Sequence, residues 1–157
     1  MTRARRILVR GGLAALIGLG LHGRTAAAQV QFSVVRVSGS PAPMKVEGAV
    51  AGSVPAAAVD RSTSYTVATL TGHEKMTAQL SAPMPFGVTL AATFDVPSNW
   101  ISIPNVALDA TARDVVTGID FTLGTTKTIT YTLSATPAAG VVPPQSRTVT
   151  LTIVSAP

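Results

Sequence analysis

Two stretches near the end of the chain, TITYTLSA (128–135) and RTVTLTIVS (147–155), decide the fold class. In both, threonine alternates with large apolar residues. Side chains of a β-strand point alternately to its two faces, so this pattern predicts strands with one buried face. Threonine suits the other face, because it is β-branched and its hydroxyl group is well solvated. The segment between them, 136–146, is rich in Pro and Gly and predicts a loop, so we expect the two strands to pair as an antiparallel hairpin.

Earlier parts of the chain repeat the alternation. In VQFSVVRV (30–37), Val30, Phe32 and Val34 share one face before the pattern changes phase at Val35. Further strands are expected in MKVEGAV (44–50), SYTVATL (64–70), KMTAQL (75–80) and GVTLAATFDV (87–96), with shorter ones in NVALDA (105–110) and DVVTGIDF (114–121). TGHE (71–74) is a turn candidate between two of them.

The spacing of these strands favours an all-β domain. About seven to nine short strands separated by turn residues predict an immunoglobulin-like antiparallel β-sandwich. A closed barrel or a jelly roll is the alternative, because strand counting does not distinguish these architectures. No stretch after residue 28 has the sustained 3.6-residue periodicity of a helix.

The first 28 residues have the three parts of a secretory signal peptide. Arginines come first, the apolar run GGLAALIGLGL (11–21) follows, and Ala26–Ala28 supplies small residues for cleavage. The apolar run is too short to span a bilayer, which needs about 20 residues. We therefore expect a helical signal peptide (1–28), cleaved after Ala28, and a single exported domain (29–157) without a membrane span. Arg5 and Arg6 leave both the twin-arginine route and the general secretory route open.

The basic charge of the chain belongs to this leader. The whole chain carries a net charge of +5, but five of its twelve Lys and Arg residues precede the expected cut. The seven that follow balance the seven Asp and Glu residues, so the mature domain is not expected to bind nucleic acid. The chain has no Cys, which excludes disulfides, thiol nucleophiles and thiolate metal sites.

Few residues are candidates for chemistry. His73 beside Glu74 is more often a solvated turn histidine than a metal ligand or a base. Asp109, Asp114 and Asp120 offer oxygen ligands for calcium, but aspartates of this kind usually cap turns. No nucleophile–base pair is recognisable, so we expect no enzymatic activity and no cofactor or metal.

Two features are candidates for partner binding. The extended segment that carries Val30, Phe32 and Val34 either completes the sheet of a neighbouring molecule or forms the first strand of its own sandwich. Trp100, in VPSNWISIPN (96–105), either fills one end of the core or stacks on a glycan or protein partner.

The leader, the Cys-free domain and the closing pattern TITYTLSA…RTVTLTIV together resemble small secreted bacterial immunoglobulin-like β-sandwich proteins, including fimbrial-type subunits. The resemblance implies a location in the periplasm, at the cell surface or outside the cell. It implies a structural or adhesive subunit that acts through strand or sheet packing, with self-association or another surface protein as the partner. The alternative is a secreted binding module for a glycan or a protein, which uses loop residues around Trp100.

Overall fold

The computed structural model describes residues 32–48 and 53–157, and the regular secondary structure of this part of the chain is almost entirely β-strand. A short 3₁₀ turn, η1 (Pro137–Ala139), follows the longest strand of this part of the chain. The strands are β1 (Ser33–Ser38), β2 (Ala58–Thr69), β3 (Glu74–Leu80), β4 (Val88–Phe94), β5 (Ile101–Ser102), β6 (Val106–Ala107), β7 (Arg113–Ile119), β8 (Thr122–Ala135) and β9 (Val149–Ser155).

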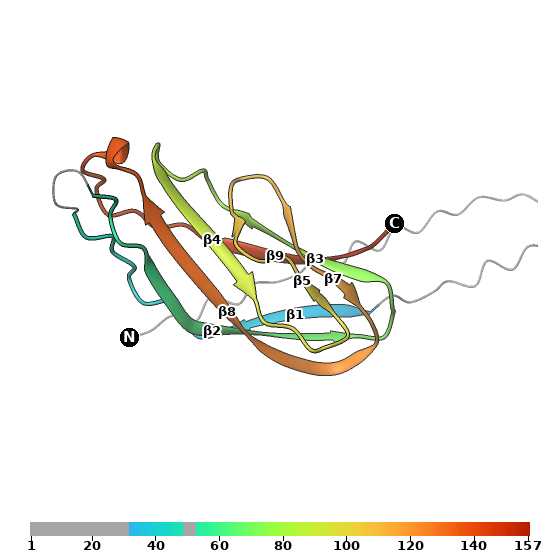
Figure 1. Ribbon diagram of the computed structural model, residues 1–157. Helices are drawn as coiled ribbons and strands as arrows, with labels where there is room; N and C mark the ends of the chain where they lie inside the picture. Colours follow the sequence, from blue (N-terminus) through green and yellow to red (C-terminus); the bar gives the residue numbers. More distant parts are fainter. Residues whose placement is uncertain (1–31, 49–52) are drawn as a thin grey trace, which may run out of the picture.

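The strands form two antiparallel sheets that pack face to face (Figure 1), which confirms the predicted β-sandwich. The five-stranded sheet has the order β1-β2-β8-β4-β6, and the four-stranded sheet has the order β5-β7-β3-β9. All ladders within the described residues are antiparallel and stay within one sheet.

The immunoglobulin strand order is not confirmed. In an immunoglobulin domain of seven strands, the second strand pairs with the fifth and the last pairs with the sixth. When the two-residue strands β5 and β6 are left out, β2 here pairs with the sixth strand, β8. The last strand, β9, pairs with β3, the third. The domain therefore has the architecture of an immunoglobulin sandwich but a different topology.

The core lies between the sheets and follows the alternation of the sequence. On β8, Ile129 and Tyr131 are buried, while Thr130 between them faces outward. On β4, Ala92 and Phe94 are buried, and the ring of Phe94 meets that of Tyr65 edge-on, with centroids 5.4 Å apart. Burial of these large side chains stabilises each by about 1.5–3 kcal/mol relative to exposure.

Two expectations about the strands are wrong. The closing segments do not form a hairpin, because β8 belongs to the five-stranded sheet and β9 to the four-stranded sheet. The turn expected at 71–74 is present at 70–73, and it leads from one sheet to the other. Residues 44–48 form no strand, and 49–50 lie outside the described residues. Alternation fixes the buried face of a strand but not its neighbour, and the long loop after β8 has room to change sheets.

The phase of β1 also differs from the expectation. Ser33, Val35 and Val37 lie opposite the inward-facing residues of β2, so they point toward the core, and Val34 points outward. The physical reason is a polar cluster at the start of β1, where an inward-facing serine is needed, as described below.

Candidate functional site

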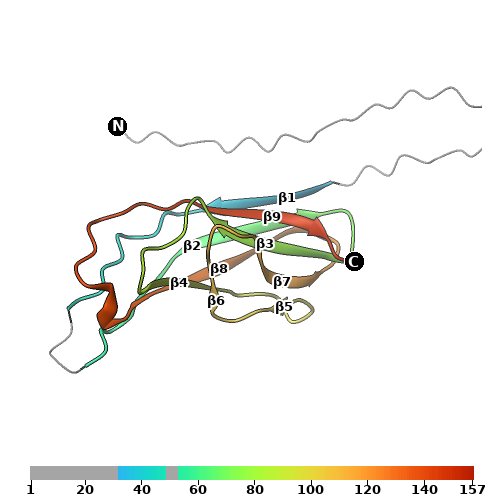
Figure 2. The ribbon, with the colours of Figure 1, turned by 90° about the horizontal axis from the view of Figure 1, so that it is seen from above.

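The most unusual feature of the sandwich is an open side formed by two edge strands. On the opposite side the edge strands, β5 and β6, have only two residues each. On the open side, β1 and β9 are full-length edge strands that lie side by side (Figure 2). Edge strands present unpaired backbone groups, so they are templates for pairing with another chain.

The register of β9 shows which backbone groups it presents. Ser81 N donates to Thr148 O over 2.9 Å, and Ala156 N donates to His73 O over 2.8 Å. Between these bonds the ladder with β3 runs without a shift. Residues of an antiparallel strand alternate between bonding inward to the partner and facing away from it. The N–H and C=O groups of every second residue of β9 therefore face the open edge: Val149, Leu151, Ile153 and Ser155.

The same reasoning applies to β1. Leu70 N donates to Phe32 O over 3.0 Å, and the ladder with β2 is also regular. The backbone groups of Ser33, Val35 and Val37 consequently face away from β2, toward the open edge.

The two strands carry little of the usual protection of an edge. Proteins blunt exposed edges with Lys, Pro, β-bulges or inward-pointing charges. β9 (VTLTIVS) contains no charged residue and no Pro, and β1 (SVVRVS) contains one charge, Arg36. The ladders that join these two strands to their sheets have no register shift, whereas the β2–β8 and β3–β7 ladders do. The open side is thus regular and nearly uncharged.

Two of the predicted partner-binding residues of the first segment, Phe32 and Val34, fall at this edge or beside it. Val30 lies outside the described residues. Phe32 is 52% exposed, and Val34 is half-buried on the outer face of the sheet. The sequence left open whether this strand pairs within its own domain or with a neighbouring molecule. In the structure it pairs with β2 of the same molecule.

A buried polar cluster holds the start of β1 in place. Glu74, only 4% exposed, begins β3, and its Oε1 accepts hydrogen bonds from Ser33 Oγ and from Thr71 Oγ1 (2.7 Å). Ser33 Oγ also lies 2.9 Å from Thr69 Oγ1, and Thr71 N donates to Thr69 Oγ1 over 3.0 Å. The cluster therefore joins β1, β2 and β3 across both sheets. Because buried polar groups are costly without partners, it favours the internal position of β1.

Trp100 belongs to the core, where the sequence placed it as one of two alternatives. Its side chain is 5% exposed and lies among the buried residues of the sandwich. Its backbone N–H donates to Pro97 O over 3.1 Å, which closes the turn before β5. A side chain so deeply buried presents little surface for stacking on a glycan.

The ionisable residues singled out in the sequence lie apart. His73 is exposed in the β2–β3 turn with a positive φ of 58°. Asp109 pairs with Arg113, whose hydrogen bond lowers the pKa of the Asp109 carboxyl group. Asp114 pairs with Lys75 over 2.9 Å. Within residues 32–48 and 53–157, no group of three or more His, Cys, Asp or Glu side chains is placed to hold a metal ion.

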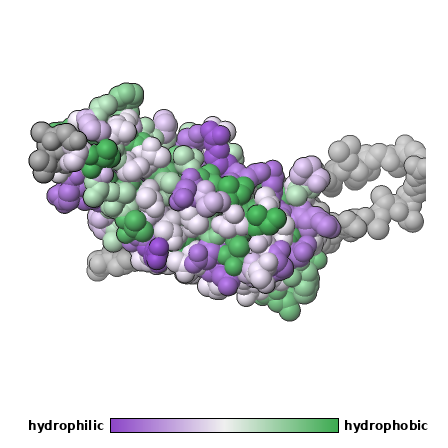
Figure 3. All heavy atoms as spheres, in the orientation of Figure 1, coloured by the Kyte–Doolittle hydropathy of each residue, from purple (hydrophilic) through white to green (hydrophobic). Residues whose placement is uncertain are grey.

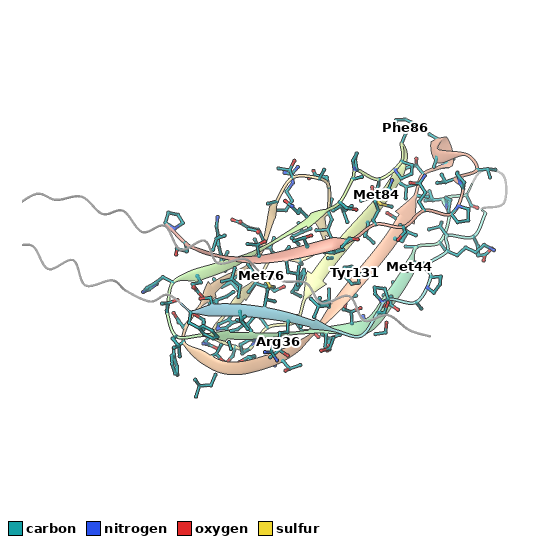
Figure 4. All side chains as sticks on the ribbon, turned by 180° about the vertical axis from the view of Figure 1, so that it is seen from behind. Arg36, Met44, Met76, Met84, Phe86 and Tyr131 are labelled. Carbon is teal, nitrogen blue, oxygen red and sulfur yellow. The ribbon has the colours of Figure 1, made fainter. Side chains whose placement is uncertain are left out.

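Sequence reasoning missed an apolar pocket at the end of the sandwich that holds η1. Its volume is about 980 Å³, and it lies between the 43–48 segment, the β3–β4 loop and the loop after β8. Met44 and Met84 reach into this end of the domain, with Phe86 at the tip of the neighbouring loop (Figure 4). The charged residues of its lining, Lys45 and Glu47, pair with each other over 3.2 Å. The residues 44–48 that the sequence assigned to a strand instead form this wall.

A second, polar hollow of about 400 Å³ lies on the outer face of the five-stranded sheet. Arg61, Asp95 and Asn105 line it together with threonines of β4 and β8. Asn105 is held there by its N–H, which donates to Thr93 Oγ1 over 2.9 Å. Side chains of these types form hydrogen bonds with hydroxyl groups.

Searches of family models, of curated proteins and of solved structures found no match to this chain. In the described part of the chain, no helix is long and apolar enough to cross a membrane.

Proposed function

We propose that the protein is an exported, non-enzymatic structural or adhesive subunit that assembles through its sheet edges. The observation that carries the proposal is the open side of the sandwich, where β1 and β9 present regular backbone edges with one charged side chain between them. Export is supported by the residues of the 1–28 segment, which have the pattern of a cleaved leader.

The mechanism is β-strand addition. An edge of a second molecule bonds to the free N–H and C=O groups of β9 or β1 and extends the sheet. Backbone bonds supply the affinity, and the absence of charge on β9 leaves nothing to repel a second copy. The threonine-rich outer faces keep each subunit soluble until the edges meet.

The experiment compares two lysine substitutions in the 29–157 protein. Thr150→Lys places a charge on the outer face of the edge strand β9. Gln79→Lys, the matched control, places the same charge on β3 directly opposite Thr150 in the ladder, but away from the edge. Sedimentation velocity at rising concentration should show assemblies for the unchanged protein and for Gln79→Lys. Thr150→Lys should need a concentration about tenfold higher, since about 1.4 kcal/mol of lost association energy has this effect.

A protein that stays monomeric at every accessible concentration would refute the structural role. Equal weakening by both lysines would refute the edge as the contact. Export has its own test, because protein recovered outside the cytoplasm should begin at Gln29 by mass spectrometry.

A glycan-binding role is the second candidate, and the polar hollow favours it more than Trp100 does. Its test is a glycan array with Arg61→Ala and, as a control, Arg36→Ala, which lies on the exposed part of β1. Loss of glycan binding in Arg61→Ala alone supports the glycan-binding role. Unchanged binding in both variants shows that the polar hollow is not the glycan site.

A further inference from the structure

The edge strand β9 has nearly the same sequence of residue types in both directions. Thr150 and Thr152 lie on either side of Leu151, and a β-branched apolar residue lies beyond each threonine, Val149 and Ile153. When two copies of one strand pair antiparallel about a two-fold axis, each residue lies opposite the residue at the same distance beyond the axis. A strand with this symmetry therefore places like residues opposite each other when it pairs with a second copy of itself.

The free backbone groups of β9 restrict how two copies can pair. In an antiparallel ladder, a residue whose N–H and C=O face the edge must lie opposite another such residue. A pair centred on Leu151 meets this condition, because Leu151 lies opposite its own copy and Val149 lies opposite the partner's Ile153. The two residues of each such pair exchange N–H···O=C bonds, so these free groups find partners within the dimer.

Neighbouring registers meet the same backbone condition but match the side chains less well. A pair centred on Thr152 places Thr150 opposite Val154. A pair centred on Thr150 places Ile153 opposite the charged side chain of Arg147. The register centred on Leu151 is thus the one in which apolar residues lie opposite apolar residues and threonines lie opposite threonines.

Both faces of β9 suit this register. On the inner face, Val149, Leu151 and Ile153 pack against the core but are only half-buried at the open side. Pairing continues this apolar layer into the second copy and removes more of it from water. On the outer face, Thr150 and Thr152 are exposed, and each lies opposite the other threonine of the partner. Cross-strand threonine pairs of this kind stabilise a sheet.

The other edge strand, β1, fits a second copy of itself less well. Its edge-facing residues are Ser33, Val35 and Val37, so a pair is centred on one of these or on a residue between them. Centring on Val35 places Arg36 opposite Val34, and centring on Arg36 places two guanidinium groups opposite each other. Like charges directly opposite each other destabilise a sheet. β9, which has no charge, is therefore the better edge for symmetric pairing.

The broad face seen in Figure 3 is a less suitable contact, because hydrophilic and apolar residues are intermingled over it. Contact through such a face covers hydrophilic side chains, which is costly unless each one finds a hydrogen-bond partner. Edge pairing instead joins polar backbone groups to one another in a regular ladder.

We infer that two copies of the protein form a two-fold symmetric dimer by antiparallel pairing of β9 with β9, centred on Leu151. The four-stranded sheets of the two copies then form one continuous sheet. Because the same surface is used on both copies, the contact closes on itself, occupies both β9 edges and leaves the β1 edges free. The inference rests on the proposed function, since it specifies which edge assembles, with which partner and in which register.

Disulfide cross-linking tests the register, because the chain has no native Cys. In the inferred dimer, Thr150 lies opposite the partner's Thr152 in a non-hydrogen-bonded pair with Cα atoms about 4.5 Å apart, which a disulfide can bridge. The two copies of Thr150 lie diagonally at about 7–8 Å, beyond that reach, and so do the two copies of Thr152. A mixture of Thr150→Cys and Thr152→Cys under mild oxidation should therefore yield heterodimer in clear excess over both homodimers.

Gln79→Cys is the matched control for this experiment. Gln79 lies opposite Thr150 on β3, one strand further from the partner, so it should give only background dimer with either variant. An excess of Thr152→Cys homodimer or of Thr150→Cys homodimer would overturn the inferred register, because it indicates a pair centred on that residue. Cross-linking at the control level in every mixture would overturn the β9 dimer itself.

Sedimentation velocity of the unchanged protein separates this inference from the function on which it rests. A dimer as the first assembled species, lost in Thr150→Lys, supports the pairing of β9 with β9. If the protein assembles but no cysteine pair cross-links above the control, the β9 dimer is wrong and assembly through the β1 edge stands. A protein that remains monomeric contradicts both the dimer and the proposed function.

Discussion

Ser33 on β1 donates a hydrogen bond to the buried carboxylate of Glu74 on β3, and this bond ties the first strand of one sheet to the other sheet. Thr71 donates to the same oxygen over 2.7 Å. The start of β1 is therefore fixed by partners that are far away in the sequence. These contacts attach the strand to its own domain.

Removal of the Glu74 side chain should loosen this attachment. In Glu74→Ala, the partly buried hydroxyl groups of Ser33 and Thr71 lose their acceptor. We expect this to cost about 1–3 kcal/mol of unfolding free energy. Urea denaturation followed by circular dichroism measures the loss. Gln79→Ala, an exposed position on the same strand, is the control. A loss in Glu74→Ala no larger than in this control would show that the cluster does not hold β1.

Gly39 should resist substitution, because it ends β1 in a conformation that other residues rarely adopt. Its φ is +85°, and a Cβ there would lie 2.5 Å from the carbonyl oxygen of Ser62. We expect Gly39→Ala to cost on the order of 1–3 kcal/mol in unfolding free energy. Gly48→Ala, where a Cβ would meet nothing within 4 Å, should be nearly neutral. Equal midpoints of thermal unfolding for the two variants would contradict this view of the turn.

Trp100 should behave as a core residue. It is the one Trp in the chain, so its fluorescence reports on this site alone. We expect blue-shifted emission in the folded protein and a loss of about 3–5 kcal/mol in Trp100→Ala. Phe86→Ala, at a side chain 84% exposed, should change stability little. Emission near that of free tryptophan in water, with unchanged stability of Trp100→Ala, would return this residue to the binding role.

The two tyrosines should make stability fall at alkaline pH. Burial, with the negative charge of Asp60 adding to it, raises the pKa of Tyr131 to about 12, and burial also raises that of Tyr65. Ionisation is thus easier in the unfolded chain, where the pKa is about 10. The stabilisation is complete below pH 10 and is lost as the pH rises toward 12, by about 1–3 kcal/mol for Tyr131.

Tyrosinate absorbance near 295 nm follows this ionisation, since Tyr65 and Tyr131 are the two tyrosines of the chain. The titration should lie well above pH 10 in native protein and near pH 10 in urea. Tyr131→Phe should remove one of the two shifted groups. Coincident native and denatured titrations would show that the phenol groups are accessible to solvent.

The sequence predicts where the strands lie better than it predicts which strands pair with each other. Alternation of threonine with apolar residues identifies β8 and β9 and the buried face of each, because burial repeats with the period of the strand. It does not predict that β9 pairs with β3, since partner choice depends on where a long loop carries the chain. The prediction of which β1 residues face the core was wrong, because Ser33, a polar residue, faces inward and bonds to Glu74.

For the candidate site too, the sequence shows the composition of each segment but not its neighbours in the fold. The lack of charge in VTLTIVS is visible in the sequence, but that this strand lies at an edge beside β1 is a property of the topology. Met44 and Val46 alternate as strand residues do, yet they line a pocket instead of pairing in a sheet. Trp100 had two consistent interpretations, and only its packing distinguishes them.

Amide hydrogen exchange tests the edge contact most directly. In dilute solution, the amides of Val149, Leu151 and Ile153 should exchange quickly, because they point away from β3, whereas those of Thr150 and Thr152 should be protected. At concentrations where the protein assembles, the first three should become protected as well, and Thr150→Lys should prevent this change. Assemblies in which these three amides still exchange as fast as in the dilute protein would contradict association through the β9 edge.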